Sequence, residues 1–106
     1  MSTILQVFTY RPRDGQHAHF MKNVAKGSKI VNRDGGKLRL WNTTSGGEPG
    51  TVVLGIENSN YKSFGEYANK LETDPEWRAF VAELQGEREP AADLISSAMY
   101  LEQPVA

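Results

Sequence analysis

The sequence predicts one α+β domain in which the elements follow the order strand, helix, strand, strand, helix, strand. Four short runs rich in β-branched and aromatic residues are typical of strands, and turns or longer amphipathic segments separate them. Two apolar helical stripes meet at Asp74-Pro75, where an Asp side chain can cap free N–H groups and proline suits the first helical position. A chain of 106 residues fits one such domain.

The first third of the chain is expected to form a strand and a helix. Residues 3–11 are rich in β-branched and aromatic types and end before Pro12, which favours a strand that leaves into a loop. Apolar residues then recur at helical spacing over residues 16–33, and glycines follow. Gly27 lies inside this helix at a cost of about 1 kcal/mol relative to alanine. A close packing contact would explain that glycine.

The remaining strands are expected at residues 37–44, 51–58 and 94–102. The first two are separated by a loop rich in glycine and proline, so they should form an antiparallel hairpin. The third is the last strand, and it follows the charged stretch 86–90, which we expect to be a solvated loop.

Two helical segments occupy the space between the third and fourth strands. The segment that follows Asp74 carries an apolar stripe that contains Trp77, and the segment before Asp74 carries a stripe that starts at Tyr61, with Tyr67 at its border. Both stripes need a surface to cover, and the sheet supplies it. We therefore expect Tyr61 and Trp77 to face the sheet and to line any cleft beneath the helices.

The element order is that of the ferredoxin-like fold, a four-stranded antiparallel sheet with its helices on one face. Alternate residues of the first strand point to opposite faces, and both sets are apolar, with Leu5 and Val7 on one face and Ile4 and Phe8 on the other. One face is covered by the helices. The other needs a cover that the chain does not supply, so we expect a homodimer through the sheet.

Composition excludes several classes of function. Formal net charge is -1 and the charged residues are interspersed, so no basic stripe indicates nucleic acid as a partner. The chain has no cysteine, which excludes disulfides, thiolate chemistry and iron–sulfur clusters. The N-terminal apolar stretch is short and broken by Gln6, with no basic region before it. We expect no signal peptide, no membrane span and a cytoplasmic protein.

Four parts of the chain resemble a known family: residues 10–15 after the first strand, Trp41 in the second, residues 59–61 and, above all, residues 73–80. With these segments the chain is similar to the NIPSNAP-like and antibiotic-biosynthesis-monooxygenase-like branch of the dimeric α+β barrel superfamily. The resemblance implies a dimer whose sheets face each other, with a ligand cleft between the sheet and helices of each subunit. It implies no single chemistry, because members include cofactor-free oxygenases, haem-degrading enzymes, isomerases and proteins of unassigned function.

The leading hypothesis is a small-molecule-binding protein that acts as a cofactor-independent monooxygenase on a phenolic or quinol substrate. Such a site needs an aromatic wall, a base and a donor for the developing oxyanion. His17 or a tyrosine such as Tyr61 would take the proton, and Arg39 or Asn42 would stabilise the oxyanion. The other candidate substrate-binding residues are Trp41, Tyr67 and Trp77.

Each of these residues also has an ordinary structural explanation. The aromatic residues can fill the core and interface of a non-catalytic dimeric module. Arg39 can pair with Glu57 on a neighbouring strand. Arg39 and Asn42 are three residues apart on one strand, so their side chains point to opposite faces of the sheet. The sequence does not say which of these faces the helices cover.

The sequence predicts neither a metal nor a cofactor. His17 and His19 lie about 200° apart around a helix, so they cannot share one ion, and no other histidine is present. We expect His17 on the Phe20 side of the helix and His19 towards solvent. Haem binding or degradation is a weaker alternative, because the haem-degrading relatives use a histidine of the second helical region and this chain has none there.

Overall fold

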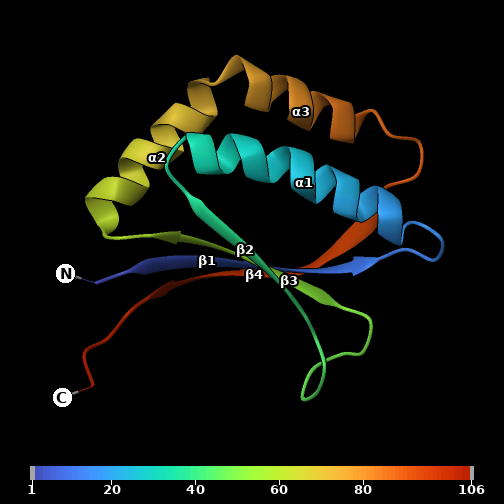
Figure 1. Ribbon diagram of the computed structural model, residues 1–106, viewed down its shortest axis with the longest axis horizontal. Coiled ribbons are helices and arrows are strands. Elements are labelled where there is room, and N and C mark those ends of the chain that lie inside the picture. The colour runs from blue at the N-terminus through green and yellow to red at the C-terminus, as the bar shows by residue number, and fades with distance from the viewer. Residues whose placement is uncertain (1, 106) are drawn as a thin grey trace.

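The computed structural model describes residues 2–105 and has the predicted element order (Figure 1). The predicted ends of the strands and of the first helix lie within two residues of the observed ones. No helix in this part of the chain is both long and apolar enough to cross a membrane. The elements are β1 Ile4–Pro12, α1 His17–Arg33, β2 Lys37–Asn42, β3 Val52–Asn58, α2 Tyr61–Thr73, α3 Pro75–Gln85 and β4 Ala92–Leu101.

The four strands form one antiparallel sheet in the order β2-β3-β1-β4, and all three helices lie on the same face of it (Figure 1). This arrangement confirms the ferredoxin-like prediction. In the central pair, Phe8 of β1 lies opposite Leu54 of β3. Directly opposed residues of an antiparallel pair point to the same face. The register therefore aligns the inward-facing side chains of the two central strands.

The helices begin and end where their local chemistry requires. The Asp74 carboxylate accepts a hydrogen bond of 2.9 Å from the backbone N–H of Glu76, and Pro75 occupies the first position of α3, as predicted. Asn60 caps α2 in the same way, by accepting from the N–H of Ser63. A Cβ on Gly27 would lie only 3.1 Å from the Phe80 ring, so the close packing contact expected at this glycine joins α1 to α3.

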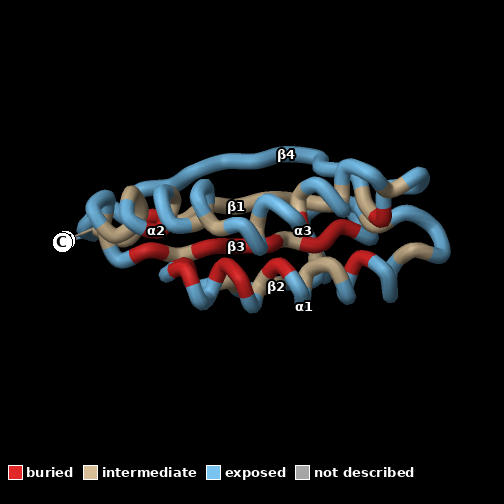
Figure 2. The backbone as a smooth tube through the Cα atoms, turned by 90° about the horizontal axis from the view of Figure 1, so that it is seen from above, coloured by how far each residue is buried: buried red, intermediate tan, exposed pale blue. Residues whose placement is uncertain are grey.

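The core lies between the helices and β3. Its main buried cluster comprises Val31 of α1, Leu54 and Ile56 of β3, and Tyr67 of α2. Figure 2 shows the buried residues concentrated along β3 and α1, whereas β4 is exposed along almost its whole length. As an edge strand with no helix above it, β4 leaves one side of the space beneath the helices thinly covered.

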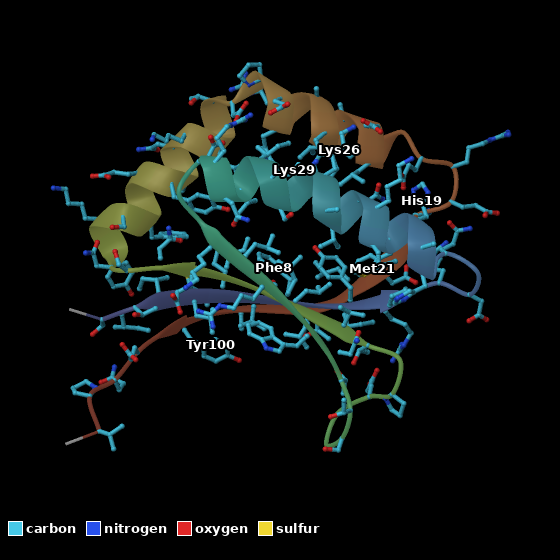
Figure 3. All side chains as sticks on the ribbon, viewed as in Figure 1. Phe8, His19, Met21, Lys26, Lys29 and Tyr100 are labelled. Atoms are coloured by element: carbon cyan, nitrogen blue, oxygen red, sulfur yellow. The ribbon has the colours of Figure 1, made fainter. Side chains whose placement is uncertain are left out.

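The structure shows which face of the sheet the helices cover. Phe8 points towards the helices, and Tyr100 of β4 points away from them (Figure 3). Trp41 lies on the open face, where its indole ring covers Gly55 so closely that a Cβ there would lie 2.8 Å from the ring. Trp41 and Tyr100 are 45% and 56% exposed. This second face is apolar, as predicted, and nothing within the described chain covers it.

Candidate functional site

A cavity of about 620 Å³ lies between the sheet and the helices. Its walls come from all three helices, from β1, β2 and β3, from the connection between α3 and β4, and from the first residue of β4. Apolar side chains dominate the lining because this is the face that the amphipathic helices turn towards the sheet. The seven aromatic residues of the wall are Phe8, Tyr10, Phe20, Phe64, Tyr67, Trp77 and Phe80.

Only a few polar groups reach this cavity. The neutral ones include Gln6 of β1 and Asn23 and Ser28 of α1. The charged ones are two carboxylates, Glu72 at the end of α2 and Glu87 after α3. No lysine, arginine or histidine is found among the lining residues in the described part of the chain. The cavity is therefore aromatic and acidic.

Glu87 and Asn23 form a polar end of the cavity, and His19 contacts Glu87 from outside it. Oε1 of Glu87 lies 2.8 Å from Nε2 of His19 and accepts a longer hydrogen bond, 3.4 Å, from Nδ2 of Asn23. The hydrogen bond to His19 lowers the pKa of Glu87, and that of Asn23 adds to the shift, although burial opposes both. Glu87 is therefore a carboxylate at neutral pH. Its side chain is 19% exposed, whereas that of His19 is 45% exposed and stands outside the cavity on α1 (Figure 3).

The two tyrosines of the wall keep their protons. Burial raises the pKa of Tyr67 to about 12, and the nearby charge of Asp34 adds to the shift. Burial likewise raises the pKa of Tyr10. Each can offer a ligand a hydroxyl group that donates or accepts a hydrogen bond. Neither is suited to act as a base near neutral pH.

Asp34, behind Tyr67, belongs to a charged cluster that joins the end of α1 to the α2–α3 junction. Arg33 makes ion pairs with Asp74 and Glu76, and its Nε lies 3.6 Å from Asp34. Burial and a hydrogen bond with Asp74 raise the pKa of Asp34. Its Oδ2 is buried and has no hydrogen-bond partner among residues 2–105. None of these four residues lines the cavity, so the cluster holds the helices together rather than contacting a ligand.

Two of the six predicted site residues line the cavity, Tyr67 from α2 and Trp77 from α3. Tyr61 does not, because it occupies the first position of α2 and is 59% exposed, so the expectation that it faces the sheet is wrong. His17 is also exposed, at the start of α1, and it does not line the cavity, although it is only three residues before Phe20 in the helix. Neither residue is part of the cavity wall.

Arg39 and Trp41 are absent from the cavity wall because β2 turns them to the open face of the sheet. Arg39 pairs with Glu57 of β3 at 3.1 Å, which confirms the ordinary structural explanation for this arginine. Leu38 and Leu40, one residue out of step with them, pack beneath the helices instead. The two faces of β2 therefore separate these predicted substrate-binding residues from Tyr67 and Trp77.

The polar end of the cavity could not be predicted from the sequence. The run that contains Glu87 was expected to be a solvated loop, and His19 was expected to lie towards solvent; it is 45% exposed and also contacts Glu87. These residues are 68 positions apart, and only the packing of α3 against α1 brings them together. The available signal was weak: Asn23 lies four residues after His19 and so shares its side of the helix.

No protein-family model matches the sequence, and no curated protein does. Solved structures do match. An uncharacterised NIPSNAP domain protein from Burkholderia xenovorans superposes with a TM-score of 0.70 at 24% identity, over 97% of this chain and 95% of that one. This chain therefore has the fold of the NIPSNAP domain proteins. A NIPSNAP family protein of unknown function from Agrobacterium tumefaciens gives 0.68 at 20% identity, over 96% of this chain and 87% of that one.

The NIPSNAP fold is shared with an oxygenase. A mutant of SnoaB, a cofactor-independent oxygenase from Streptomyces nogalater, superposes with a TM-score of 0.61 at 13% identity, over 98% of this chain and 94% of that chain. These identities show the common fold and assign no reaction to this chain.

The cavity of this chain does not fit haem. A haem pocket needs an axial ligand, most often a histidine, and its propionates favour cationic partners. The described lining residues supply neither a histidine nor a cation. The two charged residues of the lining, Glu72 and Glu87, would repel the propionates. Within residues 2–105 there is also no group of three or more His, Asp or Glu side chains that could hold a metal ion.

Proposed function

We propose that this chain binds a small aromatic molecule in the cavity between its sheet and its helices. The observation that carries the proposal is the cavity itself: about 620 Å³, within the range of small-molecule sites, with seven aromatic residues and a few convergent polar groups in its wall. Tyr67 and Trp77 contact the ligand from α2 and α3, in the substrate-binding roles predicted for them. Phe8 contacts it from the sheet.

The cavity favours binding over the alternative of a non-catalytic module whose aromatic residues only fill the core. In such a module the side chains beneath α2 and α3 would fill the space against the sheet. Trp77 and Phe80 instead pack against each other, with ring centroids 5.6 Å apart and planes tilted by 47°, and both border the cavity. An interior of this size that is lined by aromatic residues gains apolar contact when a ligand enters.

Calorimetric titration with 2-naphthalenemethanol, a neutral aromatic probe, tests the proposal. We expect binding, and we expect Ala68→Leu to weaken it about tenfold or more, because Ala68 lines the cavity and the larger side chain occupies ligand volume. Ala25→Leu is the matched control, since Ala25 lies on an exposed part of α1 outside the lining. Absence of binding to the unmodified chain, or equal loss in both variants, would contradict the proposal.

The finer hypothesis is that the bound molecule is oxygenated without a cofactor. The common fold with SnoaB supports it. With an anthrone, a base removes a proton, the resulting carbanion transfers electrons to dioxygen, one oxygen atom becomes the new ring carbonyl and the other leaves as water. Glu87 is the base in this proposal because it is a cavity-lining residue with an ionised side chain, whereas His17 and Tyr61 do not line the cavity.

Oxygen consumption with an anthrone tests this chemistry. We expect one dioxygen consumed for each quinone formed, no effect of a metal chelator, and a rate at least tenfold lower in Glu87→Gln than in the unmodified chain. Binding of the anthrone without oxygen uptake would reject the oxygenase hypothesis and leave the binding proposal intact.

The proposal includes a homodimer in which a second copy covers the open face of the sheet. That face carries Trp41 and Tyr100 exposed, with Leu5 and Val53 half-buried beside them. Its charged groups lie towards its margin, where Arg39 and Glu57 neutralise each other. An apolar face of this kind is self-complementary when two copies meet about a twofold axis.

A further inference from the structure

We infer that the cavity selects a ligand that presents a hydrogen-bond donor, an amine or a hydroxyl group, to Glu87, and that it rejects carboxylates and phosphates. This inference rests on the proposed binding function and names the class of molecule that is bound. It follows from three features of the site: the sign of its charges, the unused acceptor of Glu87, and the aromatic wall.

The first feature is the absence of a cation from the described lining. Two cations of α1, Lys26 and Arg33, make ion pairs outside the lining. Nζ of Lys26 lies 2.8 Å from Glu83, and Arg33 pairs with Asp74 and Glu76. An anionic ligand would lose its hydration on entry and would gain no opposite charge in return, while Glu87 would repel it.

The second feature is the geometry of Glu87. His19 and Asn23 both contact its Oε1, and no hydrogen bond from the described residues reaches Oε2. A carboxylate oxygen accepts hydrogen bonds and donates none. His19 and Asn23 thus hold the carboxylate in one orientation and favour its charged form, and the second oxygen remains for a donor on the ligand.

The third feature is the aromatic wall of the cavity, which Glu87 also lines. Faces of aromatic rings attract cations, and the attraction strengthens where water is excluded. The chain already shows this contact on its outer surface, where Nζ of Lys26 lies 5.9 Å from the centroid of the Phe80 ring. A protonated amine inside the cavity would meet both the ring faces and the carboxylate, so it should bind more tightly than a neutral alcohol of the same size.

Three probes that share one ring system test the inference: 2-naphthylmethylamine, 2-naphthalenemethanol and 2-naphthoate, titrated at pH 7 by calorimetry. We expect the amine to bind tightest, the alcohol next, and the carboxylate about tenfold or more weaker than the alcohol. Any other order among probes that bind overturns the inference. If none of the three binds, the proposed binding function itself fails, so the two failures are distinguishable.

Glu87→Gln tests whether this residue carries the selection. We expect the ratio of amine to carboxylate affinity to fall about tenfold or more in this variant, with the affinity for the alcohol changed much less. Glu89→Gln is the matched control, because Glu89 belongs to the same loop, is exposed and does not line the cavity. Circular dichroism confirms that both variants fold. An unchanged ratio in Glu87→Gln, or an equal fall in both variants, would overturn the role of Glu87.

Discussion

A Cβ atom on Gly36 would lie 2.9 Å from Cε1 of Tyr67, at the point where the chain enters β2. It would also lie 2.8 Å from a methyl group of Val31. These neighbours are buried and cannot withdraw easily, so only glycine fits. The backbone at this position supports the ring of Tyr67 from behind, and the same ring forms part of the cavity wall.

Gly36→Ala should destabilise the protein by about 1–3 kcal/mol, the usual cost of overpacking a filled core. Chemical denaturation measures it. The matched control is Gly65→Ala in α2, where an added Cβ meets nothing within 4 Å. There the better helix propensity of alanine should raise stability by up to about 1 kcal/mol. Equal effects of the two substitutions would show that the fit at Gly36 does not constrain the fold.

Trp41 should determine the oligomeric state. We expect a dimer at micromolar concentration by sedimentation, and a monomer after Trp41→Glu, because the charge would be buried against the second copy that covers the apolar face. Asn42→Glu is the control: this neighbour is exposed, and strand alternation turns it away from the open face. A monomeric unmodified chain would remove the homodimer from the account.

Tyr67 should impose an alkaline limit on stability. Its pKa is about 12 in the folded chain and about 10 in the unfolded chain, so unfolding releases its proton between these values. The stability due to protonated Tyr67 is complete below pH 10 and is lost as the pH rises towards 12. Tyr67→Phe should make this fall shallower. In the unmodified chain, phenolate absorbance should show one tyrosine that titrates late. An equal loss of stability between pH 10 and 12 in the unmodified chain and in Tyr67→Phe would contradict this prediction.

Asp34→Asn should stabilise the protein at pH 7. Burial is the largest cause that raises the pKa of Asp34, and the hydrogen bond with Asp74 is the second. The folded state therefore holds the Asp34 proton more tightly than the unfolded state does. The stability that protonated Asp34 contributes is present at low pH and is lost as the pH rises through the folded-state pKa. Asparagine keeps the neutral form at all pH values. Urea denaturation should show a gain at pH 7 that disappears below about pH 4, and a loss at pH 7 would contradict it.

The sequence predicted the elements and their order because those depend on local patterns. Asp74-Pro75 marked the restart of a helix, and alternation along β1 predicted two apolar faces. The site was predicted less well. Trp41 was assigned to the cleft because strand parity cannot say which face the helices cover. Glu87 was missed because its role depends on His19, 68 positions away in the chain. Tyr67 and Trp77 were found because helical periodicity indicated their inward face.

The central claim is that the space between the sheet and the helices is a ligand site. A crystal structure of the chain with 2-naphthylmethylamine tests it most directly. The account predicts electron density for the ring between Phe8, Tyr67 and Trp77, with the amine within hydrogen-bond distance of a Glu87 carboxylate oxygen. Density for the ligand on the open face beside Trp41, or a cavity that the side chains have closed, would contradict it.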